Sequence, residues 1–414
     1  MESSNPLLSV LIPTRNRDRY LSHSIQSALN VPSSDIEIIV SENHGSDAGW
    51  EVANSFSDPR LKVVRPDKPL PMHENWEFLL SQSRGRWITF IGDDDAVMPH
   101  CVAYLSYLES RFPEAEAIVS PRAYYFWEQA YNLEDASKCS FNFTHREVWK
   151  DSKKALNLCL ANKINYFDLP QIYSGGFQRR SLIQRVIRLQ SGHYFQSVTP
   201  DAYSAVVATL HTYRYLEVGV PLTWIGTSPS SKVLPSAKNK INDFFGLHSE
   251  SFSMNPCLGS TYEHWPFLIY FFEAYIAAAP FVSLQEFSLS RIREIYRVAA
   301  KELILRGQMQ SSIDLATSLG VEPAKPDFLR CHLMKHLIKR GVRLVLKVWN
   351  AFRQRLPAQL TRRLGHQVSF YYNYKATGDQ CPDILASDVA VASAYNQYQA
   401  LHMLPEERHL NTRI

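Results

Sequence analysis

Short apolar runs alternate with amphipathic segments over the first 120 residues, and this alternation leaves few folds open to the chain. Runs rich in β-branched residues predict buried strands at residues 7–13, 36–41, 61–65, 86–92 and 116–120. Apolar residues at helical spacing predict helices at residues 19–30, 48–56, 72–83 and 99–112. Strands and helices that alternate across short connections predict an α/β fold, with a mostly parallel sheet covered by helices on both faces.

The remainder of the chain is less regular. The pattern is weak between residues 124 and 165, and it then predicts a Gly-Gly turn followed by a helix up to residue 189, a helix at 199–216 and a strand at 219–226. A loop rich in Ser, Pro and Lys at residues 227–240 precedes a predominantly helical remainder. Because 414 residues are long for one compact domain, we predict a main α/β domain at residues 1–235 and a helical C-terminal region at residues 236–414.

The cysteine pattern, the N-terminus and one apolar segment bear on the cellular setting. The 6 cysteines lack the paired spacing of a zinc site or a disulfide scaffold, and the N-terminal residues lack the layout of a signal peptide. Residues 266–282 approach the length of a membrane span, but Glu273 and Pro280 within them favour a buried core helix. These features predict a cytoplasmic protein.

A strongly basic segment lies near the C-terminus. Residues 328–378 contain eleven Lys and Arg and no Asp or Glu, while the whole chain carries a net charge of only +4. Within residues 334–356, an apolar stripe that includes Trp349 lies opposite Arg340 and Arg343 on a helical wheel. Such a helix suits an anionic membrane surface, which would place the protein peripherally on the inner face of the membrane. The alternative is a helix that packs on the main domain with its basic face in water. Nucleic acid is not a predicted partner, because the sequence contains no recognisable nucleic-acid-binding module.

Polar loops follow three of the predicted strands. They begin at Thr14 after the first strand, at Ser41 after the second and at Asp93 after the fourth. Because the carboxyl ends of parallel strands meet at one edge of a sheet, these loops are expected to line one ligand site. The consecutive carboxylates of Asp93, Asp94 and Asp95 repel each other, so the cluster predicts that a cation offsets them. Mn²⁺ or Mg²⁺ prefers such hard oxygen ligands and would grip a diphosphate.

The segments SVLIPTRNRDRYLSHSIQSAL, IEIIVSENHGSD and GRWITFIGDDD, in this order and spacing, resemble the family 2 inverting glycosyltransferases of the GT-A fold. The resemblance spans residues 7–226 and implies that residues 1–235 form a catalytic domain. It implies transfer of a sugar from a nucleotide-diphosphate sugar to a saccharide or lipid-linked saccharide, in surface polysaccharide or glycolipid synthesis. Two other classes stay open: a nucleotidyltransferase, although the first loop lacks the glycines of a phosphate loop, and a non-catalytic sugar-nucleotide-binding or membrane-scaffold protein.

The resemblance also assigns donor-side residues. The family's Asp-x-Asp metal motif falls on Asp93 and Asp95, with Asp94 between them, so Asp93 and Asp95 are the implied metal ligands. The second loop of the family usually begins with two aspartates, where this chain has glutamate and asparagine. The residues implied to bind the nucleotide sugar are Pro13, Thr14, Arg15, Asn16, Glu42, Asn43, Asp47, Asp93 and Asp94.

On the acceptor side, the family places a catalytic aspartate near the start of a helix, after a glycine-rich loop. Asp201 fits that position, and Gly175 and Gly176 fit the loop. A helix N-terminus stabilises the ionised form of a carboxylate, so Asp201 is suited to accept a proton from the acceptor hydroxyl. One base without a protein nucleophile implies a single displacement with inversion. Asp168 is the alternative candidate for the base.

Overall fold

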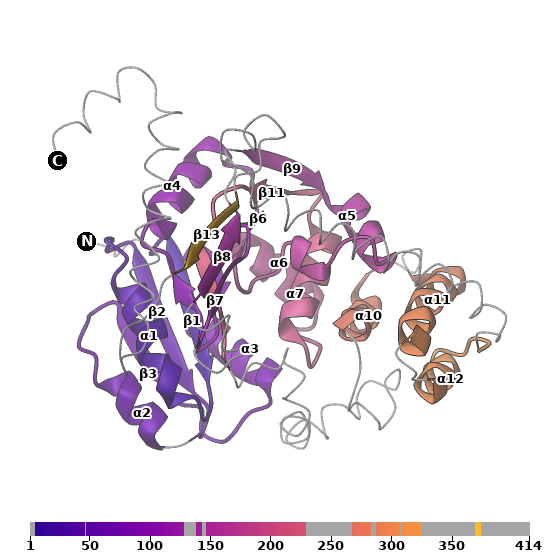
Figure 1. Ribbon diagram of the computed structural model, residues 1–414, viewed down its shortest axis with the longest axis horizontal. Coiled ribbons are helices and arrows are strands. Elements are labelled where there is room, and N and C mark those ends of the chain that lie inside the picture. The colour runs from indigo at the N-terminus through magenta and orange to yellow at the C-terminus, as the bar shows by residue number, and fades with distance from the viewer. Residues whose placement is uncertain are drawn as a thin grey trace.

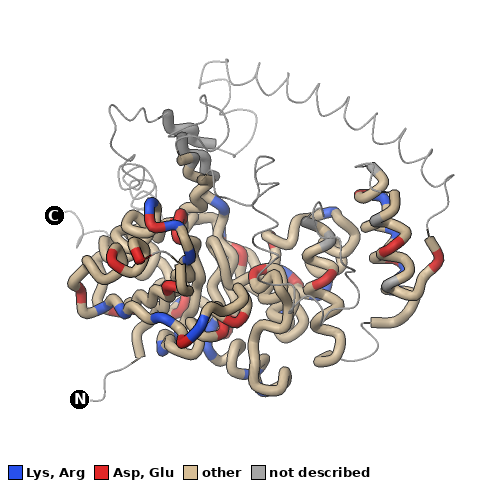
Figure 2. The backbone as a smooth tube through the Cα atoms, turned by 90° about the horizontal axis from the view of Figure 1, so that it is seen from below, with Lys and Arg blue, Asp and Glu red and all other residues tan. Residues whose placement is uncertain are grey.

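The computed structural model describes residues 5–45, 47–127, 138–142, 146–228, 267–282, 287–305, 309–323 and 369–373. The predicted basic helix at residues 334–356 and the predicted domain boundary near residue 235 lie outside these ranges. Both therefore stay predictions. Within the described ranges, acidic and basic positions are interspersed along the backbone (Figure 2).

An eight-stranded sheet forms the centre of the molecule, with the strand order β3-β2-β1-β4-β10-β6-β11-β9 (Figure 1). Strands β10 and β9 run antiparallel to their neighbours, and the other six strands share one direction. The predicted mostly parallel sheet is thus confirmed. Its strands are β1 (Leu8–Thr14), β2 (Ile36–Glu42), β3 (Leu61–Val64), β4 (Trp87–Phe90), β6 (Ala117–Val119), β9 (Glu147–Asp151), β10 (Gly176–Arg179) and β11 (Arg214–Val218).

Helices cover both faces of this sheet, as predicted (Figure 1). Alternate side chains of β1 point to opposite faces, so Val10 joins one hydrophobic core and Leu11 joins the other. The core around Val10 contains apolar residues of α1 and α4, and the core around Leu11 contains those of α3, α5, α6 and α7. The helices are α1 (Asp18–Leu29), α2 (Asp47–Asn54), α3 (Met72–Gln82), α4 (Cys101–Arg111), α5 (Ser152–Leu160), α6 (Arg180–Leu189) and α7 (Pro200–His211).

A smaller sheet lies at the carboxyl edge of the main one, with the order β13-β8-β7-β12-β5. Its strand β12 pairs with β7 and β5, so it brings a late part of the chain next to the loop that follows β4. The sequence pattern predicts only β12 among these strands. They are β5 (Ala96–Val97), β7 (Ala123–Phe126), β8 (Lys138–Asn142), β12 (Thr223–Thr227) and β13 (Ser369–Asn373).

The structure corrects the prediction of one helix at residues 199–216. Helix α7 ends at His211, and Arg214–Val218 is strand β11. Strand β11 lies between β6 and β9, and Tyr215 and Leu216 enter opposite cores. A short strand that is apolar on both faces has no alternation, so periodicity cannot distinguish it from the end of a helix. The predicted Gly-Gly turn likewise leads into strand β10 before helix α6 begins.

The described part of the C-terminal region is helical. It contains α10 (Phe267–Ala277), η4 (Ala279–Phe281), α11 (Leu289–Leu305) and α12 (Met309–Ser318). Helix α10 packs against α7, and its residues Phe271 and Tyr275 are buried in the same core as α7. This packing agrees with the interpretation of residues 266–282 as a core helix. Among the described helices, none has the length and apolar character that crossing a membrane requires.

A buried histidine makes the stability of this fold depend on pH. His100, next to α4, is 6 % exposed, and its Nε2 lies 2.8 Å from the carbonyl oxygen of Pro221. Burial lowers the pKa of His100 to about 4, although the Pro221 carbonyl acts in the opposite direction. The unfolded chain takes up this proton near pH 6.5, so between pH 6.5 and 4 the unfolded state binds more protons than the folded state. The contribution of His100 to stability is therefore complete above pH 6.5 and is lost towards pH 4.

We expect His100→Gln to reduce the fall in unfolding free energy between pH 6.5 and 4 by about 3 kcal/mol, because glutamine does not titrate. Urea unfolding of both proteins at several pH values measures this difference. Burial also lowers the pKa of His73 and His211, so a smaller slope should persist in the variant. Equal slopes in the two proteins would contradict the assignment to His100.

Candidate active site

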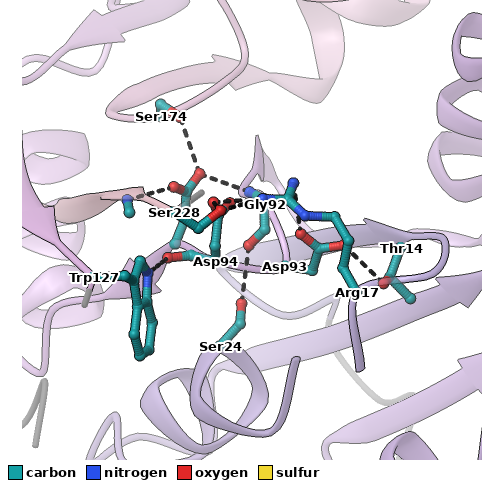
Figure 3. A network of polar contacts seen from close by, with 11 residues as sticks. Thr14, Arg17, Ser24, Gly92, Asp93, Asp94, Trp127, Ser174 and Ser228 are labelled. Carbon is teal, nitrogen blue, oxygen red and sulfur yellow. Dashed lines mark hydrogen bonds and ion pairs between the residues drawn. The ribbon is translucent and has the colours of Figure 1, made fainter. Parts of the chain in front are cut away.

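The three aspartates lie in the loop that joins β4 to β5, at the carboxyl edge of the main sheet. Asp93, Asp94 and Asp95 are 2 %, 4 % and 1 % exposed. Figure 3 shows that the side chains of Asp93 and Asp94 contact residues from several elements. A buried carboxylate needs a compensating partner, so the partners of each aspartate indicate what it can do.

Asp95 anchors the loop to the backbone. Its Oδ2 accepts a hydrogen bond from the Gly92 N–H at 2.7 Å, and its Oδ1 accepts one from the Gly226 N–H at 2.8 Å. The hydroxyls of Tyr173 and Ser174 also hydrogen-bond to this carboxylate. Burial and the Asp94 charge raise the pKa of Asp95 to about 7, while the bonds from Gly92, Gly226 and Tyr173 act to lower it. The predicted role of Asp95 as a metal ligand stays a prediction, and the structure shows the residue bound on both oxygens by the protein itself.

Asp93 and Asp94 instead converge on one positive charge, the guanidinium of Arg17. Arg17 Nη1 lies 2.9 Å from Asp93 Oδ1, and Nη2 lies 2.5 Å from Asp94 Oδ2 (Figure 3). Thr14 Oγ1 donates to Asp93 Oδ2 at 2.8 Å, and Ser228 Oγ donates to Asp94 Oδ2 at 2.7 Å. Burial acts to lower the pKa of Arg17, but the charges of Asp93 and Asp94 outweigh it and raise that pKa above its ordinary value. Within the described part of the chain, Arg17 is thus the cation that the acidic cluster predicts.

The predicted nucleotide loops after β1 and β2 lie side by side. Asn16 has a left-handed φ of 57°, and Gly45 approaches it so closely that a Cβ at Gly45 would lie 2.6 Å from the Asn16 backbone nitrogen. Thr14 joins the first loop to the acidic loop through Asp93. The three loops therefore meet at one edge of the sheet, as their positions after parallel strands predict.

Two polar residues of the second loop, Glu42 and Asn43, are held by hydrogen bonds and an ion pair within the protein. Glu42 Oε1 accepts the Gly45 N–H at 2.5 Å, and its Oε2 lies 2.6 Å from Arg65 Nη2. Asn43 donates to the Leu70 carbonyl at 2.7 Å and accepts the Leu70 N–H at 2.8 Å. These bonds connect the end of β2 to the segment before α3. The role of Glu42 and Asn43 in binding the nucleotide stays a prediction, as does that of Asp47 in the first turn of α2.

Asp201 lies in the first turn of α7, as predicted, and is held by a tyrosine. Tyr166 Oη donates to Asp201 Oδ2 at 2.7 Å. Burial and the charge of Asp201 raise the pKa of Tyr166 well above its usual value, so the phenol stays protonated and donates this bond. Tyr173, a second tyrosine, hydrogen-bonds to Asp95 in the acidic loop. The candidate base and the acidic loop are thus each held by the hydroxyl of a tyrosine.

Asp168, the alternative base, caps a turn instead. Its Oδ2 accepts the Asn165 N–H at 3.1 Å, and the Asn165 side chain accepts the Phe167 N–H in return. This capping box closes the 3-10 helix η1 (Tyr166–Asp168). The assignment of the base to Asp201, with Asp168 as the alternative, stays a prediction.

The predicted acceptor-side glycines form a tight turn beside the acidic loop. Ser174 has a φ of 46° and Gly175 a φ of 97°, and the turn directs the Ser174 hydroxyl to Asp95 Oδ2 at 3.2 Å. A Cβ on Gly176 would lie 1.8 Å from the carbonyl oxygen of Gln171, so this position tolerates only glycine. The turn therefore joins the acidic loop through Ser174, and the acceptor-side role of Gly175 and Gly176 stays a prediction.

The sequence pattern does not predict several residues of the site. Arg17 directly follows the predicted first loop, and its charge, which can pair with the three carboxylates, is the signal that could identify it. Tyr173 and Ser174 directly precede the Gly-Gly turn. Gly226 and Ser228 have no such signal, because they reach the acidic loop only through the pairing of β12 in the smaller sheet.

Comparison with known proteins identifies the family of the N-terminal segment. Residues 9–149, which include β1 to β4 and the acidic loop, match the sequence model described as glycosyl transferase family 2. Over these residues the chain is similar to family 2 glycosyltransferases. This confirms the resemblance given by the three sequence motifs and, with the sheet order described above, the predicted GT-A-type fold class.

Curated relatives match part of this chain over part of their own length. A GalNAc(5)-diNAcBac-PP-undecaprenol beta-1,3-glucosyltransferase of Campylobacter jejuni is 33 % identical over 103 residues, which are 24 % of this chain and 33 % of that protein. Glycosyltransferase GlyG of Streptococcus pneumoniae is 24 % identical over 126 residues, which are 30 % of this chain and 41 % of GlyG. The chain thus spans about a third of the length of these relatives.

Solved structures of distant sequence also align with much of this chain. Residues 1–349 of TarS from S. aureus align with 81 % of this chain and 91 % of that one, at 12 % identity and a TM-score of 0.42. The mannosyltransferase PcManGT from Pyrobaculum calidifontis, solved with GDP-Man and Mn²⁺, aligns with 77 % of this chain and 88 % of its own, at 14 % identity and a TM-score of 0.38.

Proposed function

We propose that the protein transfers a sugar from a nucleotide-diphosphate sugar to a saccharide hydroxyl, with inversion at the anomeric carbon. The observation that carries this proposal is the convergence of two buried carboxylates, Asp93 and Asp94, on one cation within the segment that is similar to family 2 glycosyltransferases. Asp201, at the start of α7, is held in place by the hydroxyl of Tyr166. A diphosphate site and a general base are the two parts that an inverting transfer needs.

The carboxylates of Asp93 and Asp94 fit a divalent metal. Among the residues that the structure describes, no group of three or more His, Cys, Asp or Glu is arranged to hold a metal ion. Mg²⁺, however, usually binds one or two carboxylates and takes its other ligands from water and substrate phosphates. Asp93 and Asp94 already place one oxygen each around a single positive charge. A bound Mn²⁺ or Mg²⁺ would supply positive charge to the diphosphate leaving group.

The residues of this chain then have distinct roles in the proposed transfer. Asp201 accepts the proton of the attacking acceptor hydroxyl, and Tyr166 holds the carboxylate through its hydrogen bond to Oδ2. The loops after β1 and β2 bind the nucleotide. The Ser174-Gly175-Gly176 turn lines the side from which the acceptor approaches. Because the oxygen attacks in one step and the base forms no bond to the sugar, the product has the inverted configuration.

We further propose a lipid-linked acceptor at an anionic membrane surface on the cytoplasmic side. The Campylobacter relative carries an undecaprenol-linked saccharide in its name, which supports this class of acceptor. The basic segment at residues 328–378 supports it independently, because each Lys or Arg near an anionic surface contributes about 1 kcal/mol of attraction.

An assay of sugar transfer from UDP- and GDP-sugars in the presence of Mn²⁺ tests both proposals. The acceptor is presented either as a free saccharide or as a lipid-linked saccharide in vesicles with anionic lipids. We expect Mn²⁺-dependent transfer of the sugar, and faster transfer to the lipid-linked acceptor at low salt than at high salt. Pyrophosphate release from a nucleoside triphosphate and a sugar phosphate would instead indicate a nucleotidyltransferase. Nucleotide-sugar binding without any turnover would indicate the non-catalytic class.

A further inference from the structure

The guanidinium of Arg17 occupies the position between Asp93 and Asp94 at which a cation is expected. Its two terminal nitrogens each pair with a different carboxylate, at 2.9 and 2.5 Å. The Nη2 atom also donates to Ser228 Oγ at 2.8 Å, and Ser228 Oγ in turn donates to Asp94. Arg17 therefore links the first loop, the acidic loop and the residue that follows β12 (Figure 3).

A divalent ion and Arg17 would use the same carboxylate oxygens. Asp93 binds Arg17 through Oδ1 and Thr14 through Oδ2, and Asp94 binds Arg17 and Ser228 through Oδ2. An ion that coordinates either carboxylate at this position would meet the guanidinium at close range. Two cations repel each other strongly where water is largely excluded. Binding of a divalent ion to the carboxylates and pairing of Arg17 with them therefore exclude each other.

Arg17 is placed so that its side chain can leave. The Arg17 side chain is 25 % exposed, whereas those of Asp93 and Asp94 are 3 % and 5 % exposed. Arg17 is the residue before α1, and its side chain makes no capping hydrogen bond to that helix. A rotation of the side chain into solvent would therefore break its bonds to the acidic loop and to Ser228 without unwinding α1.

We propose that Arg17 is an internal counter-ion that closes the carboxylate pair of Asp93 and Asp94 and has to leave when a divalent metal binds to that pair. This inference rests on the proposed function for the identity of the metal site. Arg17 thereby weakens the binding of the metal in the absence of the nucleotide. The negative charge of a nucleotide diphosphate favours the release of Arg17, so metal and donor should bind cooperatively.

The affinity of the full chain for Mn²⁺, measured without nucleotide from the electron paramagnetic resonance signal of free Mn²⁺, tests the proposal. We expect Arg17→Gln to bind Mn²⁺ about tenfold more tightly than wild type, within the usual range of such coupling. Arg17→Lys keeps a charge but cannot pair with both carboxylates through separate nitrogens, so its affinity should be intermediate. Arg185→Gln is the matched control, because Arg185 pairs with Glu116 at 2.7 Å away from the site, and its Mn²⁺ affinity should equal that of wild type.

Unchanged or weaker Mn²⁺ binding by Arg17→Gln would overturn the proposal. If this variant does not fold, titration of the wild-type protein with Mg²⁺ decides, followed through the NMR signals of the Arg17 side-chain N–H groups. If these N–H protons exchange faster with solvent once Mg²⁺ is bound, the displacement of Arg17 is supported. If their exchange rate is unchanged at saturating Mg²⁺, the proposal is overturned. These results are separate from the transfer assay. Tighter Mn²⁺ binding by Arg17→Gln without any sugar transfer would support the counter-ion and contradict the proposed function. Sugar transfer together with unchanged Mn²⁺ binding by Arg17→Gln would support the proposed function and contradict the counter-ion.

Discussion

Asp201→Asn is expected to lower the turnover of sugar transfer by about 10²–10⁴-fold, the range typical for loss of a general base. Asparagine has nearly the same shape and can still accept the hydrogen bond that Tyr166 donates to Asp201 at 2.7 Å, but it cannot accept a proton. The fold and the affinity for the nucleotide sugar should therefore stay unchanged. Transfer kinetics, together with calorimetric titration of the donor, separate the two quantities.

Asp168→Asn is the control for this prediction. Asp168 caps η1 through the Asn165 N–H, and asparagine can accept the same hydrogen bond, so the unfolding free energy and the turnover should both stay close to wild type. If Asp201→Asn retained wild-type turnover while Asp168→Asn lost it, the base would have to be assigned to Asp168.

Asp93→Asn is expected to lower turnover by about 10²–10³-fold and to remove the dependence of nucleotide binding on Mn²⁺. The amide is a neutral and weaker metal ligand than the carboxylate, while its oxygen can still accept the hydrogen bond from Thr14 Oγ1. Arg17 and Asp94 keep their own contact in this variant, so we expect the acidic loop to keep its conformation. Turnover and nucleotide affinity, each measured over a range of Mn²⁺ concentrations, test both parts.

Glu116→Gln is the matched control for Asp93→Asn, because Glu116 also pairs with an arginine but lies outside the site. Its turnover and Mn²⁺ dependence should equal those of wild type. Nucleotide binding by Asp93→Asn with an unchanged dependence on Mn²⁺ would remove Asp93 from the metal site. The metal would then have to be sought at Asp95, which the sequence motif also implies.

The alternation of strands and helices makes the first half of the fold predictable. The apolar runs predict strands at residues 7–13, 36–41 and 86–92, and the structure contains β1, β2 and β4 at these places. Because parallel strands direct their carboxyl ends to one edge, the sequence alone is enough to place the polar loops that follow them together. The position of Asp201 in the first turn of a helix is predictable for a similar reason, since Thr199 and Pro200 mark the start of that helix.

The partners within the site are not predictable, because they depend on tertiary contacts. Three adjacent aspartates predict a cation, but the sequence does not tell whether that cation is a metal or Arg17, which precedes Asp93 by 76 positions. The motif likewise treats Asp93 and Asp95 as equivalent ligands. In the structure, the backbone N–H groups of Gly92 and Gly226 distinguish Asp95 as the residue that anchors the loop.

The support of the acidic loop from Gly226 and Ser228 has a consequence for how the protein acquires its site during synthesis. The bonds from Gly226 to Asp95 and from Ser228 to Asp94 span 131 and 134 positions of the chain. A nascent chain that ends at residue 149 contains the whole family match but neither of these donors. Contacts of such long range form late, because the intervening chain must first be ordered. They also lower the rate of folding. The carboxylates should therefore reach their final arrangement only after β12 has left the ribosome and paired with β7.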